Sequence, residues 1–265
     1  MRPRCCALWR TRQPPYVEES LQEVLSRIPA GRGLPVFFRA DDVVTPDDAL
    51  KDLMALFTRH RVPLALAVIP ARFTMPYWRG LKKMAAADPG LWCWHQHGWR
   101  HINHERKGKK QEFGPSRSRI QLETEVDWGR QWLHSVMEEA FTPIFTPPWN
   151  RCSTETLALL RARGYLAVSR SVGSLPPPPK GLPDIAVNID LHTRREKDPR
   201  QSWRNLLREM AAATEQGRWG VMIHHRFMSP VAFTFLDILL GILAADPRIE
   251  MVGMNELAAS GVGGP

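Results

Sequence analysis

Long apolar segments are missing from this sequence. The strongest candidate, VAFTFLDILLGILAA at residues 231–245, is shorter than the roughly 18 apolar residues of a membrane span and contains Asp237. The N-terminal stretch MRPRCCALWRTRQPP has the positive charge of a signal peptide but lacks its apolar centre. We therefore expect no membrane partner and a cytoplasmic location.

Cysteine is scarce, and its spacing excludes the common structural zinc sites. The four cysteines, Cys5, Cys6, Cys93 and Cys152, form no C-x-x-C pair. This pattern is typical of a reducing compartment, where disulfides are rare. We expect free thiols.

Lysine makes up only eight of the 36 basic residues, although the formal net charge is +9. The basic residues are scattered, and the densest run, ERKGKK at 105–110, is six residues long. A nucleic-acid-binding protein usually gathers such charges on one face. We interpret the run as a solvated loop and expect no nucleic-acid partner.

Strand-like and helix-like segments alternate seven or eight times along the chain, which indicates parallel βαβ units. No glycine-rich loop follows the first strand-like segment, PVFFRADDV at 35–43, which disfavours a nucleotide-binding sheet. The length of 265 residues favours an α/β fold, a distorted (β/α) barrel with about seven parallel strands. We expect an extension with a helix outside the main fold over residues 1–30, and a single barrel domain over residues 31–260.

Polar residues follow the apolar segments at five of the predicted strand ends. In a (β/α) barrel the loops after the strands converge on one end, which carries the active site. These residues are Asp41 and Asp42 after VFFRA, His97 and His101 after LWCW, Thr146 to Arg151 after TPIF, Asp190 and His192 after AVNI, and His224 and His225 after GVMI.

Two of these groups have the chemistry of a metal site. His97 and His101 are four residues apart and can reach one point if the chain turns helically after the strand. One carboxylate of the Asp41–Asp42 pair would complete a two-histidine, one-carboxylate set, and the other could act as a base. Each pattern alone is also found in surface histidines and helix caps, so the prediction depends on their combination. His95 and His104 are candidates for auxiliary contacts.

This combination resembles the polysaccharide deacetylase family, the NodB-homology group of family 4 carbohydrate esterases, over residues 35–257. The family's aspartate pair is similar to RADDV, and its H-[ST]-x-x-H motif is similar to HGWRH at 97–101, with Gly98 at the Ser/Thr position. The segment TPPWNR at 146–151 looks like the third motif, with Thr146 where the family has arginine. Asp190 and VMIHH are similar to the fourth and fifth motifs.

The resemblance implies a metal-dependent hydrolase that removes an acyl group, usually N-acetyl, from an amino sugar. It implies Asp42, His97 and His101 as ligands of a divalent metal, with zinc expected before cobalt or nickel. Asp41 would be the general base on metal-bound water, and His224 the acid that protonates the leaving amine, oriented by Asp190. Substrate contacts are expected from Trp99, Pro148, Trp149, Arg151 and His225.

Two departures leave alternatives open. Thr146 cannot steady the base aspartate as an arginine would, and either Arg39 or Arg151 could supply that charge. His224 and His225 compete for the role of acid, because neighbouring residues of a strand point to opposite faces.

Two other functions fit the same resemblance. Members of the superfamily open cyclic amides such as allantoin, and a barrel of this kind could bind a glycan without catalysis. The presence of base, ligand and acid positions favours a hydrolase, acting on a small saccharide or a related acylated compound. No feature of the sequence defines an oligomeric state.

Overall fold

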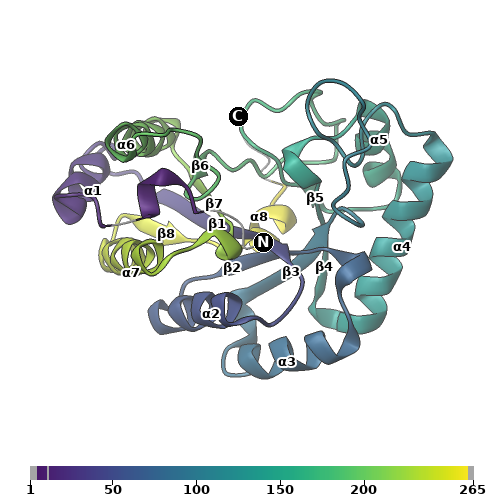
Figure 1. The fold of residues 1–265 in the computed structure, drawn as a ribbon, viewed down its shortest axis with the longest axis horizontal. Helices are drawn as coiled ribbons and strands as arrows, with labels where there is room; N and C mark the ends of the chain where they lie inside the picture. The colour runs from purple at the N-terminus through teal and green to yellow at the C-terminus, as the bar shows by residue number, and fades with distance from the viewer. Residues whose placement is uncertain (1–4, 11, 262–265) are drawn as a thin grey trace.

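The computed structural model describes residues 5–10 and 12–261, and its centre is one parallel β-sheet (Figure 1). The strands are hydrogen-bonded in the order β5-β4-β3-β2-β1-β7-β6, and β8 pairs with the start of β1. The predicted distorted (β/α) barrel with about seven parallel strands is confirmed. The strands are β1 (Leu34–Val43), β2 (Leu64–Val68), β3 (Trp92–His97), β4 (Phe141–Thr146), β5 (Ala167–Val168), β6 (Ile189–Asp190), β7 (Trp219–Ile223) and β8 (Ile249–Met251).

Helices surround the sheet (Figure 1). Several begin at a side chain that accepts a backbone N–H of the first turn, including Asp47 before α2, Ser118 before α4 and Ser153 before α5. The α-helices are α1 (Val17–Leu25), α2 (Asp48–His60), α3 (Met75–Ala85), α4 (Arg119–Met137), α5 (Thr154–Ala162), α6 (Pro199–Gln216), α7 (Pro230–Ala245) and α8 (Met254–Ala259). Short 3-10 turns are η1 (Ala7–Trp9), η2 (Pro70–Arg72), η3 (Pro89–Leu91), η4 (Glu138–Ala140), η5 (Pro148–Asn150) and η6 (His225–Phe227).

The segment that leads from β5 into β6 brings the two edges of the sheet together. On the β5 side, Ile185 N–H donates to the Val168 carbonyl at 2.8 Å. On the β7 side, Asn188 N–H donates to the Gly220 carbonyl at 2.9 Å. Because a short segment with isolated bridges makes this connection, the barrel is distorted rather than regular.

The barrel interior changes from apolar to polar toward the carboxyl ends of the strands. Alternate residues of a strand share a face, so each strand carries its interior residues two positions apart. The apolar floor contains Phe37, Ala65, Cys93, Ile144 and Ala167. Two positions further along lie buried polar residues, Arg39, His95, Thr146 and Ser169, and above them Asp41 and His97.

The N-terminal segment packs into the main hydrophobic core, whereas the sequence placed its helix outside the main fold. Leu21 and Leu25 of α1 are fully buried, and α1 contacts α6 and α7. The Trp9 side chain is also buried, its Nε1 donates to the Leu191 carbonyl at 2.6 Å, and its ring centroid lies 4.6 Å from that of Phe235. The extension therefore shares its core with the barrel.

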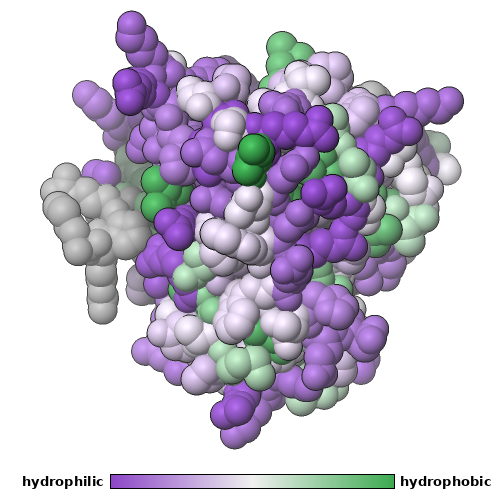
Figure 2. Space-filling view, turned by 90° about the vertical axis from the view of Figure 1, so that its right-hand side faces the viewer, coloured by the Kyte–Doolittle hydropathy of each residue, from purple (hydrophilic) through white to green (hydrophobic). Residues whose placement is uncertain are grey.

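The face of the molecule around α4 and α5 is mainly hydrophilic, with scattered apolar side chains (Figure 2). Ile120 and Trp128 of α4 are among the exposed apolar residues. None of the described helices combines the length and the apolar character that a membrane crossing requires. All four cysteines are free thiols.

Candidate metal centre and active site

Two consecutive carboxylates, Asp41 and Asp42, face one site because β1 is irregular at its end. The pairing of β1 with β2 shifts register between Ala40 and Val43, and Asp42 adopts a left-handed backbone with φ 62°. Consecutive residues of a regular strand point to opposite faces. The distortion therefore allows both carboxylates to reach the carboxyl end of the barrel.

The structure brings Asp42, His97 and His101 together. Asp42 Oδ1 lies 3.3 Å from His97 Nε2 and 3.2 Å from His101 Nε2. One potential ligand atom of each residue lies within 4.8 Å of the other two. His97 is buried, while Asp42 and His101 are half-buried, so the cluster is closed on the barrel side and reachable from outside. This arrangement suits a metal bound by two histidines and one carboxylate.

The hydrogen bonds around the cluster also fit a cation. His97 Nδ1 donates to the Thr146 carbonyl at 3.0 Å, so Nε2 of the neutral ring presents a lone pair to Asp42. Asp42 Oδ1 is buried and has no hydrogen-bond partner among the described residues. Two facing lone pairs need a cation or a proton between them. A carbonyl that holds the far nitrogen is the usual outer contact of a metal-binding histidine.

The charges of the cluster are strongly coupled. Burial raises the pKa of Asp42, but the adjacent His97 outweighs it, and the pKa lies well below its usual value. Burial lowers the pKa of His97, but Asp42 and Asp41 outweigh it and raise the pKa above its usual value. Burial and the charge of His97 lower the pKa of His101 to about 4, which makes His101 neutral near pH 7. A metal would therefore displace a proton from His97.

The loop between His97 and His101 is held by a buried glutamate that the sequence did not single out. The Glu112 carboxylate accepts the N–H of Trp99 at 3.1 Å and of Arg100 at 2.6 Å. Gly98 has φ 58°, and a Cβ there would lie 2.2 Å from Glu112 Oε2. Glu112 thus fills the space that a Ser or Thr side chain of the family motif would need.

Arg39 supplies the charge that Thr146 cannot. Its Nε and Nη2 donate to the two carboxylate oxygens of Asp41 at 2.8 and 2.9 Å. The fully buried guanidinium also donates to Ser169 Oγ at 2.7 Å and to Asn150 Oδ1 at 2.6 Å. Burial raises the pKa of Asp41, but the Arg39 charge outweighs it and holds the pKa below its usual value. Of the two arginines considered from the sequence, Arg39 contacts Asp41.

Thr146 joins two histidines beneath the site. Its carbonyl accepts from His97, and its hydroxyl lies 2.9 Å from His95 Nε2. Burial lowers the pKa of His95 to about 3, so its ring is neutral. His95 therefore supports the cluster indirectly, whereas His104 lines a separate hollow beside Glu105.

His224 and His225 point to different sides of β7. His224 continues the inward-facing series of Met222, is half-buried, and its charge helps to lower the pKa of both Asp41 and Asp42. His225 is fully buried, with Nε2 3.9 Å from Asp47 Oδ1 at the start of α2. The His225 side chain, for which a substrate contact was expected, does not reach the surface. His224 occupies the position that faces the site.

The expected pairing of Asp190 with His224 is not formed. Asp190 Oδ1 accepts the N–H of His192 at 3.0 Å and of Thr193 at 2.9 Å, so the carboxylate caps its own turn. His192 contacts the backbone of His224 instead of its ring, because His192 Nδ1 accepts the backbone N–H of His224 at 3.2 Å. Asp190 thus shapes the loop behind His224 without touching its ring.

A groove of about 420 Å³ runs beside the cluster and is lined by Trp149, Asn150 and Arg151. The Trp149 ring centroid lies 4.5 Å from that of His101. Pro148 is buried, so its expected substrate contact is not supported. Trp99 is partly buried and packs on Trp128 with ring centroids 6.0 Å apart. Trp149 and Arg151 are therefore the predicted substrate contacts that the structure places at the groove.

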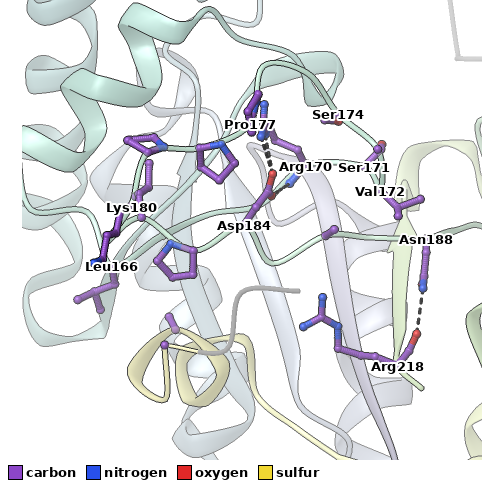
Figure 3. A pocket seen from close by; sticks show the side chains of 18 of the residues that line it. Leu166, Arg170, Ser171, Val172, Ser174, Pro177, Lys180, Asp184, Asn188 and Arg218 are labelled. Carbon is purple, nitrogen blue, oxygen red and sulfur yellow. Dashed lines mark hydrogen bonds and ion pairs between the residues drawn. The ribbon is translucent and has the colours of Figure 1, made fainter. Parts of the chain in front are cut away.

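A larger hollow of about 710 Å³ shares the loop at residues 171–174 with this groove (Figure 3). Its lining includes Arg170 and Asp184, which form an ion pair at 2.6 Å. Asp42, His97 and His101 do not line it. The hollow is therefore separate from the candidate metal centre.

Comparison of the sequence with protein-family models and with curated proteins finds no match. Solved structures do match. A protein of Mycobacterium smegmatis assigned as a polysaccharide deacetylase aligns with 88% of this chain and 91% of its own at 16% identity and a TM-score of 0.63. A family 4 acetyl xylan esterase of Clostridium thermocellum, solved with a cobalt ion, aligns with 85% and 91% at 14% identity and a TM-score of 0.55. PuuE allantoinase aligns with 88% and 92% at 12% identity and a TM-score of 0.60.

The strand order and these matches define the class as a NodB-type distorted (β/α) barrel. The chain has the fold of the polysaccharide deacetylases and family 4 carbohydrate esterases, as its motifs indicate. Because an allantoinase has the same fold, the fold alone does not decide which amide is hydrolysed.

Proposed function

We propose that this protein is a metal-dependent hydrolase that removes an acyl group, most simply N-acetyl, from an amino sugar. The observation that carries the proposal is the convergence of Asp42, His97 and His101 next to an ion-paired Asp41. Trp149, which lines the neighbouring groove, packs on His101 of this cluster. The resemblance of the sequence assigns residues of the same types, in the same order, to the motifs of the polysaccharide deacetylase family.

Asp42 Oδ1, His97 Nε2 and His101 Nε2 would hold the metal. Nitrogen and oxygen donors in this number suit zinc, and cobalt or nickel accept the same set. A divalent metal bound there would polarise the acyl carbonyl and lower the pKa of water. Thr146 contributes by fixing the His97 ring, so that its Nε2 faces Asp42.

Asp41 is the proposed base. The Arg39 fork keeps its carboxylate ionised and in one orientation, so an oxygen of Asp41 can take a proton from the attacking water. Asn150 and Ser169 hold the Arg39 side chain in turn. This support is built from side chains of the barrel interior, which makes its geometry rigid.

His224 is the proposed acid. A carbon–nitrogen bond of an amide breaks readily only when the departing nitrogen receives a proton, and a half-buried imidazole facing the site can deliver one. Trp149 has a left-handed backbone with φ 57°, and its ring packs on His101. Its backbone N–H is our candidate donor to the carbonyl oxygen as charge develops on it.

The test is acetate release from N-acetylated sugars by protein loaded with zinc, cobalt or nickel. Asp41→Asn should lower the rate by about 10²- to 10⁴-fold while metal content stays constant. His97→Ala should lose both metal and activity. His104→Ala, a histidine of the same segment that lies outside the cluster, is the matched control and should keep both.

Two results would contradict the proposal. One is full activity in metal-free wild type. The other is stoichiometric metal with no release from any acylated sugar. Opening of allantoin by the loaded enzyme, without acetate release, would support the cyclic-amide alternative instead.

A further inference from the structure

The groove beside the metal cluster is bordered by basic side chains and by no acidic one. Lys109 and Arg151 line it. Lys110 follows in the same loop and places its Nζ 5.9 Å from the centroid of the Trp149 ring. The opposite wall is the loop at residues 171–175, which offers two serines but no charge. Two cations therefore line this groove, and a third lies beside its Trp149 wall.

These cations have no carboxylate partner in the part of the chain that the structure describes. No Asp or Glu oxygen lies within 4.0 Å of the side-chain nitrogens of Lys109, Lys110 or Arg151. The two acids of the same loop are engaged elsewhere, Glu105 with a serine and Glu112 with backbone N–H groups. The positive charge at the groove is thus available to a ligand.

The larger hollow is a weaker candidate for the same role. Its Arg170 is already paired with Asp184, as Figure 3 shows. Lys180 and Arg218 also line it, but the metal cluster does not border it. The groove, by contrast, has two residues in its wall that contact the site, because the Trp149 ring centroid lies 4.5 Å from that of His101 and Asn150 accepts a hydrogen bond from Arg39.

We propose that the acylated sugar hydrolysed at this site carries a phosphate ester, which Lys109, Lys110 and Arg151 bind. The inference rests on the proposed function, because that function places the acyl group at the metal cluster. Trp149 contacts both His101 and Lys110. A sugar ring on the Trp149 face would have its acyl group toward His101 and its phosphate toward Lys110.

The charges favour a phosphate over a single carboxylate. A phosphate monoester carries about two negative charges at neutral pH and has three acceptor oxygens, which can meet several cations at once. The hydroxyl of Ser171, on the facing wall, adds a further donor. A neutral glycan would leave all three cations unused.

The experiment compares equilibrium binding of four ligands to metal-loaded protein by calorimetry. They are N-acetylglucosamine, its 1-phosphate, its 6-phosphate and its uridine diphosphate ester, so that free sugar phosphates are distinguished from a nucleotide-linked sugar. We expect at least one phosphorylated ligand to bind about tenfold or more tightly than the neutral sugar, the effect of one charge-assisted contact. Lys109→Gln and Arg151→Gln should each reduce that ratio about tenfold. Lys83→Gln, an exposed lysine of α3, is the control and should leave it unchanged.

The outcomes separate this inference from the proposed function. Equal affinities in wild type, or a ratio that Lys109→Gln and Arg151→Gln leave unchanged, would overturn the phosphate site. If acetate were then released from the neutral sugar, the hydrolase function would be supported and only the phosphate site would be refuted. A high ratio that falls in both variants, with no hydrolysis of any ligand, would sustain the phosphate site and refute the hydrolase.

Discussion

Arg39 and Asp41 form a two-pronged ion pair on the inner face of one strand, with N–O distances of 2.8 and 2.9 Å. Two residues of β1 thereby provide both the proposed base and its counter-charge. The last position of β4, where the family motif has its arginine, therefore does not have to supply this charge. Thr146 at that position instead holds His97 through its carbonyl and His95 through its hydroxyl.

Removal of the Arg39 charge should shift the pH dependence of activity. In Arg39→Gln, burial acts on Asp41 without the opposing guanidinium, so the pKa of Asp41 rises. The base must be ionised, and the acid limb of the kcat/KM profile should therefore move to higher pH. Arg39→Lys is measured in the same way. It keeps a positive charge at this position and can be used if Arg39→Gln does not fold.

The matched control for this prediction is Arg170→Gln, which breaks another ion pair of a fully buried arginine. Arg39→Gln should lose several kcal/mol of unfolding free energy, about 3–5, because the buried Asp41 carboxylate is left without a counter-charge. Arg170→Gln should lose less, because Asp184 is half-buried and still accepts the backbone N–H of residue 170. Arg39→Gln should move the acid limb furthest, Arg39→Lys less because it keeps a positive charge without the two-pronged contact, and Arg170→Gln not at all. If the acid limb of the kcat/KM profile were unchanged in both Arg39 variants, Arg39 would have a structural role only.

Glu112 should determine how well the metal is held. In Glu112→Ala the N–H groups of Trp99 and Arg100 lose their acceptor, and the loop between His97 and His101 loosens. We expect the metal affinity, measured by chelator competition, to fall about 10- to 100-fold. Glu105→Ala removes a glutamate of the same loop that bonds Ser116 and should leave the affinity unchanged. Equal affinities in both variants would exclude the positioning role of Glu112.

The buried His192 should make the metal-free protein sensitive to acid. Burial lowers the pKa of His192 to about 3, below its unfolded value of 6.5. The unfolded chain therefore takes up a proton that the folded protein excludes, and stability is lost as the pH falls below about 6.5. In His192→Asn, which keeps an acceptor for His224 N–H, the loss of unfolding free energy between pH 6 and 5 should be smaller by up to about 1.4 kcal/mol per pH unit.

Urea unfolding at pH 7, 6 and 5 measures this dependence. His134→Asn on the exposed surface of α4 is the control and should retain the wild-type slope. A His192→Asn slope equal to that of wild type would show that another group carries the acid sensitivity.

The clustering of Asp42, His97 and His101 could be predicted because it follows from a one-dimensional pattern. Parallel strands of a barrel end on one side, so ionisable residues directly after several strands must meet there. The period of two along β1 likewise places Arg39 and Asp41 on one face. The sequence still left Arg151 as an alternative, because no periodicity constrains the loop after β4.

Other contacts depend on the paths of the loops, which the local sequence pattern does not predict. Glu112 reaches Gly98 only because the chain folds back after residue 102, and its neighbours in the sequence do not distinguish it. Asp190 turns away from His224 because a short polar side chain at a strand end readily accepts the N–H groups two and three residues ahead. The motif placed Asp190 at the right strand but could not predict its partner.

The position of Trp9 also bears on how the protein is made. Its Nε1 bonds to Leu191, 182 residues later in the chain, and its ring packs on Phe235, which is later still. During synthesis α1 cannot bury its apolar face until α6 and α7 have been made. In the same way, β1 cannot pair with β7 until β7 has been made. Contacts of such long range form slowly and leave apolar surface exposed in the meantime. The ribosome therefore releases nearly the whole chain before the barrel can close around its own beginning.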